Sequence, residues 1–423
     1  MVARGEVKSR LGRVLLRAYR HTASALLLTL ALAACGSVAT PLWQAAAPTA
    51  VPVAVGGAAT NVPPAATVRP RSTLADARFS TAGWRTDFSM SSLPLGEITP
   101  GGPGRDGIPP IDAPRFVTVT AANAWLKPRE PVIVVARGAL ARAYPLQILI
   151  WHAIVDDDFG GAPLAVTFCP LCNTAIAFDR RLAGRVLDFG TTGNVRDPDL
   201  VMWDRQTESW WQQITGEVIV GELTGQRLAM VAATIVSWET FVAQYPRGQV
   251  LSRETGYDRS SGRNPYVGDD DIDTPPFLYD GPLDGRLPPK ERVVTVSLGG
   301  EHVAYPFGRL AERRVVAATV GGEAIVVRYQ PGTASARDTA QIAEARDIGA
   351  AGIYRPEADG RPLTFAWRDG AFVDLETGST WSVLGLAMAD PLAGKPLAPV
   401  VHGDHFWFAW TIFRPQTRLF GAR

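Results

Sequence analysis

The chain has 423 residues, of which 46% are hydrophobic and 20% are charged, and its formal net charge at pH 7 is +1. This is the composition of a globular protein with enough apolar residues for a sizeable core, and the length predicts two or three domains. The balanced charge provides no electrostatic basis for binding nucleic acid, so no nucleic-acid partner is expected.

Residues 1–35 are predicted to be a lipoprotein signal peptide. Basic residues precede the apolar run 23–34, which is too short to span a bilayer comfortably. The run ends in Leu32-Ala33-Ala34-Cys35, which resembles a bacterial lipobox and implies cleavage before Cys35 and lipidation of its sulfur. The alternative is an ordinary secretory signal with a chance cysteine. Either interpretation predicts export. Lipidation would anchor the protein to the extracytoplasmic face of a membrane. The sequence does not indicate a protein partner.

Residues 36–75 are rich in Ala, Pro, Val and Thr, without the period of a helix or a strand. They are predicted to form a flexible tether between the lipid and the folded body. The body then begins near residue 76.

The first part of the body, residues 76–253, contains a series of predicted short elements. The expected strands are 132–138, 164–168, 200–205 and 217–223, with a hairpin over 175–190 and a short helix over 144–155 that has a proline near its start. These elements predict an α+β fold that is mostly antiparallel β with few helices.

Two long stretches resemble each other, which predicts a tandem duplication of one unit. Tyr144-Pro145 aligns with Tyr305-Pro306 at an offset of 161 (305 − 144), and the same offset aligns Gly160-Gly161 with Gly321-Gly322. Further along, Trp238 aligns with Trp407. The expected copies are residues 76–253 and 292–423, joined by an inter-copy segment at 254–291.

The two copies differ at their chemically distinctive residues. His152 aligns with Arg313, Cys169 with Gln330, and Cys172 with Thr333. Packing alone would have kept these residues or apolar equivalents, so the comparison favours a specific role for the three residues in the first copy and makes the second copy degenerate.

The motif Cys169-Pro-Leu-Cys172 predicts a metal site, because a C-x-x-C turn brings two sulfurs to one side. His152 is the expected third ligand. Copper is favoured over zinc, because the ligands are soft and the expected compartment is oxidising. Met202 or one of the carboxylates of residues 156–158 is a weaker candidate for a fourth ligand.

Two other interpretations of the cysteine pair stay open. A Cys-Pro-x-Cys motif resembles that of thiol–disulfide oxidoreductases, although no helix is predicted after it. A structural disulfide in the turn is the third interpretation. A non-catalytic binding module is the corresponding alternative for the whole protein, and whether it is an enzyme is left open. The acidic stretches 155–161 and 268–273 are expected to be solvated loops, and His402 and His405 to be packing residues.

Five segments together resemble the bacterial and archaeal family catalogued as domain of unknown function 3179. They are GRDGIPPID, AYPLQILIWHAIVDD, VTFCPLCNTAIAFDR, NVRDPDLVMWDRQTESWWQQITGEVIVG and TGYDRSSGRNPY. The resemblance runs from about Gly101 to near the C-terminus. It implies an exported or lipid-anchored protein and supplies no activity. The residues it marks are His152, Cys169, Pro170, Cys172, Asp204, Arg205, Gln206, Thr207, Tyr257, Asp258, Arg259 and Tyr266. Of these, Asp204, Arg205, Tyr257 and Asp258 are the candidates for supporting the metal ligands from outside.

Overall fold

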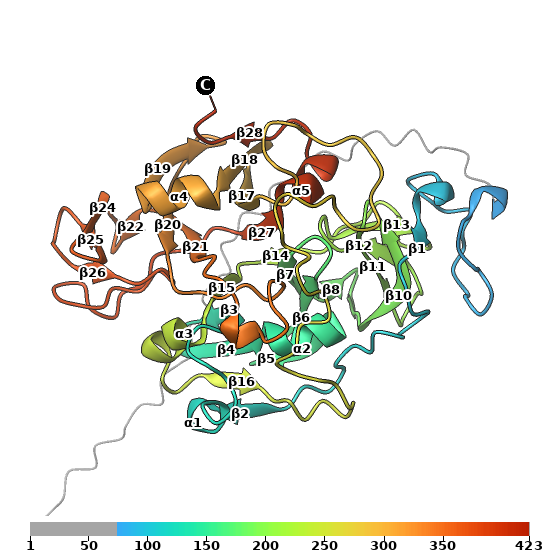
Figure 1. Cartoon of the computed structure of the whole chain (residues 1–423), viewed down its shortest axis with the longest axis horizontal. Coiled ribbons are helices and arrows are strands. Elements are labelled where there is room, and N and C mark those ends of the chain that lie inside the picture. The colour runs from blue at the N-terminus through green and yellow to red at the C-terminus, as the bar shows by residue number, and fades with distance from the viewer. Residues whose placement is uncertain (1–73, 423) are drawn as a thin grey trace, which may run out of the picture. The chain divides into compact units, whose positions relative to one another are not determined.

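The computed structural model describes residues 74–422 (Figure 1). The predicted signal peptide with Cys35, and nearly all of the predicted tether, lie outside these residues. Strands make up 39% and helices 12%, in mainly antiparallel sheets with five helices, which confirms the predicted mostly antiparallel character. Within the described part, no helix has the length and apolarity needed to cross a membrane.

Three main sheets form the first half of the body, which we define as residues 76–253. The first has the order β1(Thr99–Pro100), β10(Phe189–Arg196), β11(Asp199–Asp204), β12(Trp210–Gln212), β13(Glu217–Val220). The second has the order β14(Met230–Val231), β7(Thr174–Asp179), β6(Ala162–Cys169), β5(Ile154–Phe159). The third has the order β15(Thr234–Ser237), β3(Pro131–Arg137), β4(Leu140–Pro145), β16(Gln249–Leu251), β2(Phe116–Thr118), in which only β16 and β4 pair in parallel. A small hairpin joins β8(Arg181–Leu182) to β9(Arg185–Val186).

The second half, residues 292–423, is built from shorter sheets. Their orders are β27(His402–Phe406), β17(Arg292–Leu298), β18(Glu301–Pro306), β28(Arg418–Leu419); then β19(Val315–Val320), β20(Glu323–Gln330), β21(Ala350–Tyr354); and then β24(Phe365–Arg368), β25(Ala371–Asp374), β26(Thr380–Trp381). The pair β22(Glu357–Ala358) and β23(Arg361–Pro362) stands apart from these.

The helices are all short. The α-helices are α1(Val119–Ala122), α2(Leu146–His152), α3(Trp238–Gln244), α4(Phe307–Arg313) and α5(Trp407–Phe413), and the 3-10 turns are η1(Leu74–Asp76), η2(Leu95–Glu97) and η3(Ile342–Glu344). Helices α2 and α4 begin directly after a proline, whose fixed φ and missing N–H suit the start of a helix.

The predicted helix over 144–155 is too long at its C-terminal end. Helix α2 ends at His152, because Ala153 takes a positive φ of 60° that no α-helix can continue. Ile154 and Val155 then pair with Thr167 and Val166 as the start of β5. This pairing places the end of α2 beside the end of β6, where the cysteine motif begins.

Five consecutive elements of the two halves have the same bounds after one offset. Strands β3, β4, β5 and β6 and helix α2 become β17, β18, β19, β20 and α4 when 161 (292 − 131) is added to each residue number. Helices α3 and α5 are related by an offset of 169 (407 − 238). Even the positive φ that ends α2 recurs after α4, at Arg314.

The two halves share an apolar core beside the cysteines. Strand β27 of the second half lies next to β7 of the first (Figure 1), and the Phe406 N–H donates to the carbonyl of Cys172 at 2.9 Å. Cys169 and Cys172 belong to the same buried cluster as Phe406 and Trp407. The cysteine turn is therefore covered by the second half.

Candidate functional site

The two cysteines lie in the tight turn between β6 and β7. Cys169 is the last residue of β6 and pairs with Thr174, the first residue of β7. The Asn173 N–H donates to the Pro170 carbonyl at 3.2 Å, and Asn173 takes a positive φ of 51°, which asparagine tolerates better than most residues. Both sulfurs are buried, and both cysteines are free thiols.

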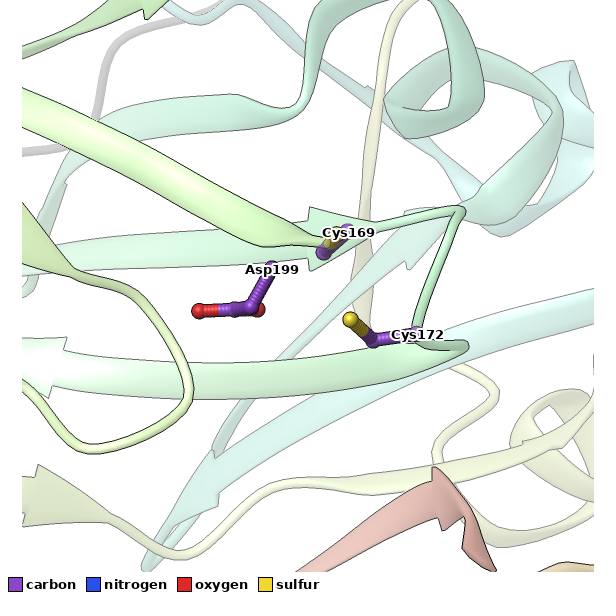
Figure 2. Close-up of side chains that lie close together, drawn as sticks. All are labelled: Cys169, Cys172 and Asp199. Carbon is purple, nitrogen blue, oxygen red and sulfur yellow. The ribbon is translucent and has the colours of Figure 1, made fainter. Parts of the chain in front are cut away.

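Asp199 is the third member of the site. It is the first residue of β11, and its carboxylate lies beside the two thiols (Figure 2). One ligand atom from each of Cys169, Cys172 and Asp199 falls within 4.8 Å of the others, and all three residues are buried. Ligand atoms around a tetrahedral zinc ion stand about 3.5–4 Å apart, so this group is compact enough to share one ion.

One oxygen of Asp199 is fixed by hydrogen bonds, and the other is not. Oδ2 accepts from the Gln212 side chain at 2.6 Å and from the Ile214 N–H at 2.9 Å. Oδ1 is buried and accepts no hydrogen bond from a nitrogen or oxygen donor among the described residues, and the neighbouring Cys172 thiol interacts with the same carboxylate. A buried carboxylate oxygen left without a donor is costly, and a bound cation would satisfy it.

Burial dominates the protonation of the group. It raises the pKa of Asp199 to about 7, against the effect of hydrogen bonds that include those from Gln212, Ile214 and the Cys172 thiol. Burial likewise raises the pKa of Cys172 well above that of an ordinary thiol, and the neighbouring Cys169 and Asp199 raise it further. Cys172 and Asp199, packed together out of water, therefore resist ionising unless a cation joins them.

Arg337 brings a positive charge to the thiols from the second half. The residue is fully buried, its guanidinium packs over the ring of Phe406, and it forms an ion pair with Asp269. Burial lowers its pKa to about 10, and the charges of Cys169 and Cys172 oppose that shift. The charge of Arg337 in turn acts to lower the pKa of Cys172, against the larger effect of burial.

A small pocket opens beside Cys169. Its volume is about 90 Å³, and its walls include Cys169, Pro170, Leu200, Tyr266 and Phe277. The lining is largely apolar, with Tyr266 and Phe277 contributed by the segment that joins the two halves. A small molecule can therefore approach one sulfur without the whole site being open to water.

His152 is the last residue of α2 and Cys169 is the last residue of β6, but both ring nitrogens of His152 have hydrogen-bond partners other than the cysteines. Nδ1 lies 2.8 Å from the carbonyl oxygen of Pro109, to which it donates, and Nε2 lies 3.2 Å from the Thr255 hydroxyl. The ring of Tyr257 packs against it with 5.7 Å between centroids, and burial lowers the pKa of His152. The compact group of candidate ligands contains Asp199 in the place where the sequence predicts His152.

Asp204 closes a turn in the first half. Its carboxylate accepts from the Thr207 N–H at 2.6 Å and from the indole N–H of Trp211 at 2.9 Å. In the second half, Asp374 accepts from Thr377 at 2.6 Å and from Trp381 at 2.8 Å in the same pattern. Since the second pattern occurs without cysteines, these contacts indicate a structural role for Asp204.

The other predicted supporting residues also lie away from the thiols. Arg205 forms ion pairs with Asp106 and Asp112, both at 3.0 Å, and so ties the segment before β2 to β11. Tyr257 covers His152 and is half exposed, and Asp258 is exposed. None of these residues belongs to the cysteine–carboxylate group.

The prediction that the two acidic stretches are solvated loops is wrong for their central residues. Asp156 and Asp157 are buried in β5, where Asp157 binds Arg142 and the Tyr144 hydroxyl, and burial raises the pKa of Asp156 well above its usual range. Asp270 is buried against Arg292 at 3.0 Å. Buried cations make these positions favourable for carboxylates, and a charge-run pattern does not reveal such partners.

Sequence reasoning missed Asp199 and Arg337. Asp199 is 27 residues beyond Cys172 (199 − 172), in a different sheet, so no ligand spacing connects them. The signal that remained was a carboxylate directly before a predicted apolar strand, within one of the segments that resemble the family. Arg337 gave no local signal, because it reaches the site from the other half.

No curated protein and no solved structure matches the chain. The family described as Protein of unknown function (DUF3179) matches residues 105–417, a stretch that contains Cys169, Cys172, Asp199 and Arg337. This match covers most of the chain, and the protein therefore belongs to the DUF3179 family.

Proposed function

We propose that the protein binds a divalent transition-metal ion through Cys169, Cys172 and Asp199, and that it handles this ion outside the cytoplasm. The observation that carries the proposal is the compact buried group of two free thiols and the Asp199 carboxylate, whose Oδ1 accepts no hydrogen bond from a nitrogen or oxygen donor among the described residues. Two thiolates and a carboxylate are a donor set that zinc accepts.

The charges around the group favour a divalent ion over copper(I). Three ionised ligands carry one negative charge more than a divalent ion neutralises, and the buried Arg337 supplies one further positive charge. Asp269, which forms an ion pair with Arg337, also forms one with Lys290 at 3.1 Å. The charges of Asp269 and Lys290 cancel each other, so the charge of Arg337 is left to offset that of the metal group. A carboxylate oxygen is also a harder ligand than the predicted imidazole, which shifts the preference from copper toward zinc.

Three protein ligands leave one position of a tetrahedral ion for an exchangeable group. Zinc sites that act on or pass on small molecules keep such a position, whereas structural zinc sites fill all four. The pocket of about 90 Å³ beside Cys169 provides the access that an exchangeable ligand needs. The site therefore suits metal transfer or reaction at the ion better than a structural role.

We also propose that the two halves arose by duplication and that the second lost the ligands. The common offset of five elements supports this, as do the paired networks of Asp204 and Asp374. Asp199 pairs with Arg196 across its hairpin, and the corresponding pair in the second half is Arg368 with Ala371. The two cysteine positions therefore carry Gln330 and Thr333 in the second half. The position of Asp199 corresponds to Ala371 when it is counted from the turn, and to Asp369 when it is counted back from Asp374, because β25 is two residues shorter than β11.

The predicted signal peptide and lipidation of Cys35 complete the proposal. They place the metal site on the extracytoplasmic side of a membrane, at the end of a tether. In such a compartment a metal ion also protects a pair of thiols, because dithiols there tend to oxidise.

A thiol–disulfide oxidoreductase is the competing function, and the proximity of the two cysteines favours it. Against it, the turn leads into strand β7 and not into a helix whose N-terminus would stabilise a thiolate. Burial also raises the pKa of Cys172, which keeps this thiol protonated.

Metal analysis of the purified full-length protein tests the proposal. We expect about one equivalent of zinc per chain from the three-ligand set, and almost none in Cys172→Ser. Inductively coupled plasma mass spectrometry measures the metal content, and circular dichroism checks that the variant is folded. Copper in place of zinc would retain the site and overturn the charge argument. Metal-free protein with a Cys169–Cys172 disulfide would overturn the metal proposal in favour of the oxidoreductase.

A further inference from the structure

A second pocket lies between the halves, outside the thiol group. Its volume is about 250 Å³, and it is lined by β7, β17, β18, β27 and α5 together with the segment 227–230. Its polar side chains of interest are Arg227, His302, His402, His405 and Arg414. Nothing in the metal proposal uses these residues.

The polar wall of this pocket is cationic. Two guanidinium groups, those of Arg227 and Arg414, line it, and no carboxylate is among the lining residues. Glu217, which is not among the lining residues, forms an ion pair with Arg227, and its charge also acts on Arg414. Burial lowers the pKa of His302, and the charges of Arg414 and Arg227 lower it further, so both guanidinium groups act on this one ring.

Two imidazoles have a nitrogen that is free to meet a ligand. His405 is buried, its Nδ1 lies 2.9 Å from the Thr174 hydroxyl, and its Nε2 has no hydrogen bond among the described residues. His302 binds Ser297 through Nδ1 at 2.7 Å, which leaves its Nε2 without a partner in the same part of the chain. His402 differs, because Val400 and Thr234 occupy both of its ring nitrogens.

An indole connects the two available imidazoles. The Trp410 ring stacks on His405 with 5.0 Å between centroids, and it meets His302 edge-on at 6.3 Å. Ile176, Ile214 and Leu228 complete an apolar wall. The pocket therefore has a cationic part and a flat apolar part, with neutral hydrogen-bonding nitrogens between them.

Gly403 keeps room for this arrangement. A Cβ at this position would come within 2.4 Å of Nε2 of His405. The φ of Gly403 does not require glycine. Glycine at this position therefore makes space for the imidazole of His405 and is not needed for the backbone conformation. Strand β27, which carries the ring of His405, therefore also makes room for it at Gly403.

We propose that this pocket binds a small organic carboxylate with a planar apolar body. The carboxylate would lie between Arg227 and Arg414 within reach of the imidazoles, and the apolar body would pack against Trp410 and the aliphatic wall. Guanidinium groups bind carboxylates through paired hydrogen bonds, and an aromatic surface binds flat apolar groups.

Calorimetric titration of the full-length protein tests this proposal with three probes: benzoate, its neutral analogue benzamide, and inorganic phosphate. We expect benzoate to bind, and benzamide and phosphate each to bind at least about tenfold more weakly, since one lacks the charge and the other lacks the apolar body. Equal binding of benzoate and benzamide, or of benzoate and phosphate, would overturn the proposed ligand class.

Variants with matched exposure make the test specific. Arg227→Gln removes a side chain that is 49% exposed and ion-paired to Glu217, and the control Arg185→Gln removes one that is also 49% exposed and ion-paired to Glu222. Arg227→Gln should weaken benzoate binding about tenfold and leave benzamide binding unchanged, while Arg185→Gln should change neither. No benzoate binding at millimolar concentration, or the same affinity in both variants, would contradict the proposal.

Discussion

Removing the divalent ion is expected to lower the melting temperature of the wild-type protein by several degrees. A ligand that binds only the folded state stabilises it by about 3–4 kcal/mol when its free concentration exceeds the dissociation constant a hundred- to a thousandfold. Without the ion, the protein must bury two thiols and the carboxylate of Asp199 with no nitrogen or oxygen donor for Oδ1 among the described residues. Thermal unfolding with and without a strong chelator, followed by circular dichroism, measures the difference.

Two neighbouring aspartates provide the control for this experiment. Asp199→Asn keeps an oxygen for the Gln212 and Ile214 donors but removes the ligand charge, so the melting temperature of this variant should no longer respond to the chelator. Asp197, in the turn just before it, has a positive φ of 54° that asparagine accepts, so Asp197→Asn should respond as the wild type does. A wild-type protein that is insensitive to chelation would refute the proposed site.

Replacing Asp204 or Asp374 by alanine is expected to destabilise the protein by similar amounts, about 3 kcal/mol each. Both carboxylates are fully buried, and each accepts hydrogen bonds from a threonine N–H, a threonine hydroxyl and an indole N–H. Alanine leaves these donors without an acceptor, and the indole is too deeply buried to be rescued by water. Urea denaturation measures the shift in each variant.

The zinc content of the same two variants decides whether Asp204 supports the proposed metal site. If the role of Asp204 is structural, the variants Asp204→Ala and Asp374→Ala should contain equal amounts of zinc. Asp258 is exposed, so Asp258→Ala should match the wild type in both zinc content and stability. Loss of metal from Asp204→Ala at a stability equal to that of Asp374→Ala would instead assign Asp204 a role beside the ligands, as the sequence predicted.

The sequence predicts the individual helices, strands and turns of this protein better than it predicts which of them contact one another. The strand that includes Val132, the proline-initiated α2 and the turn between the cysteines follow from patterns within a few residues. The end of α2 was placed too late, because a positive φ at Ala153 has no sequence signal of its own. Short-range patterns specify such elements because the interactions that form them are themselves short-range.

For the same reason, the sequence points to only part of the compact cysteine–carboxylate group. The cysteine pair is one local turn, and its interpretation as a metal-binding pair is consistent with the geometry. His152 comes to the level of Cys169 as its helix predicts, but Pro109 and Thr255 hold its ring nitrogens, and both are distant in sequence. Asp199 and Arg337 arrive through sheet pairing and through contact between the halves, which no spacing within either segment encodes.

The hydrogen bond from Phe406 to the Cys172 carbonyl, and the charge of Arg337 acting on the thiols, mean that the second half helps to build the candidate site. A gene truncated in the joining segment would encode every donor atom and yet yield a turn laid bare to solvent and oxidants. The later half of the polypeptide thus shields the cysteine turn of the earlier half.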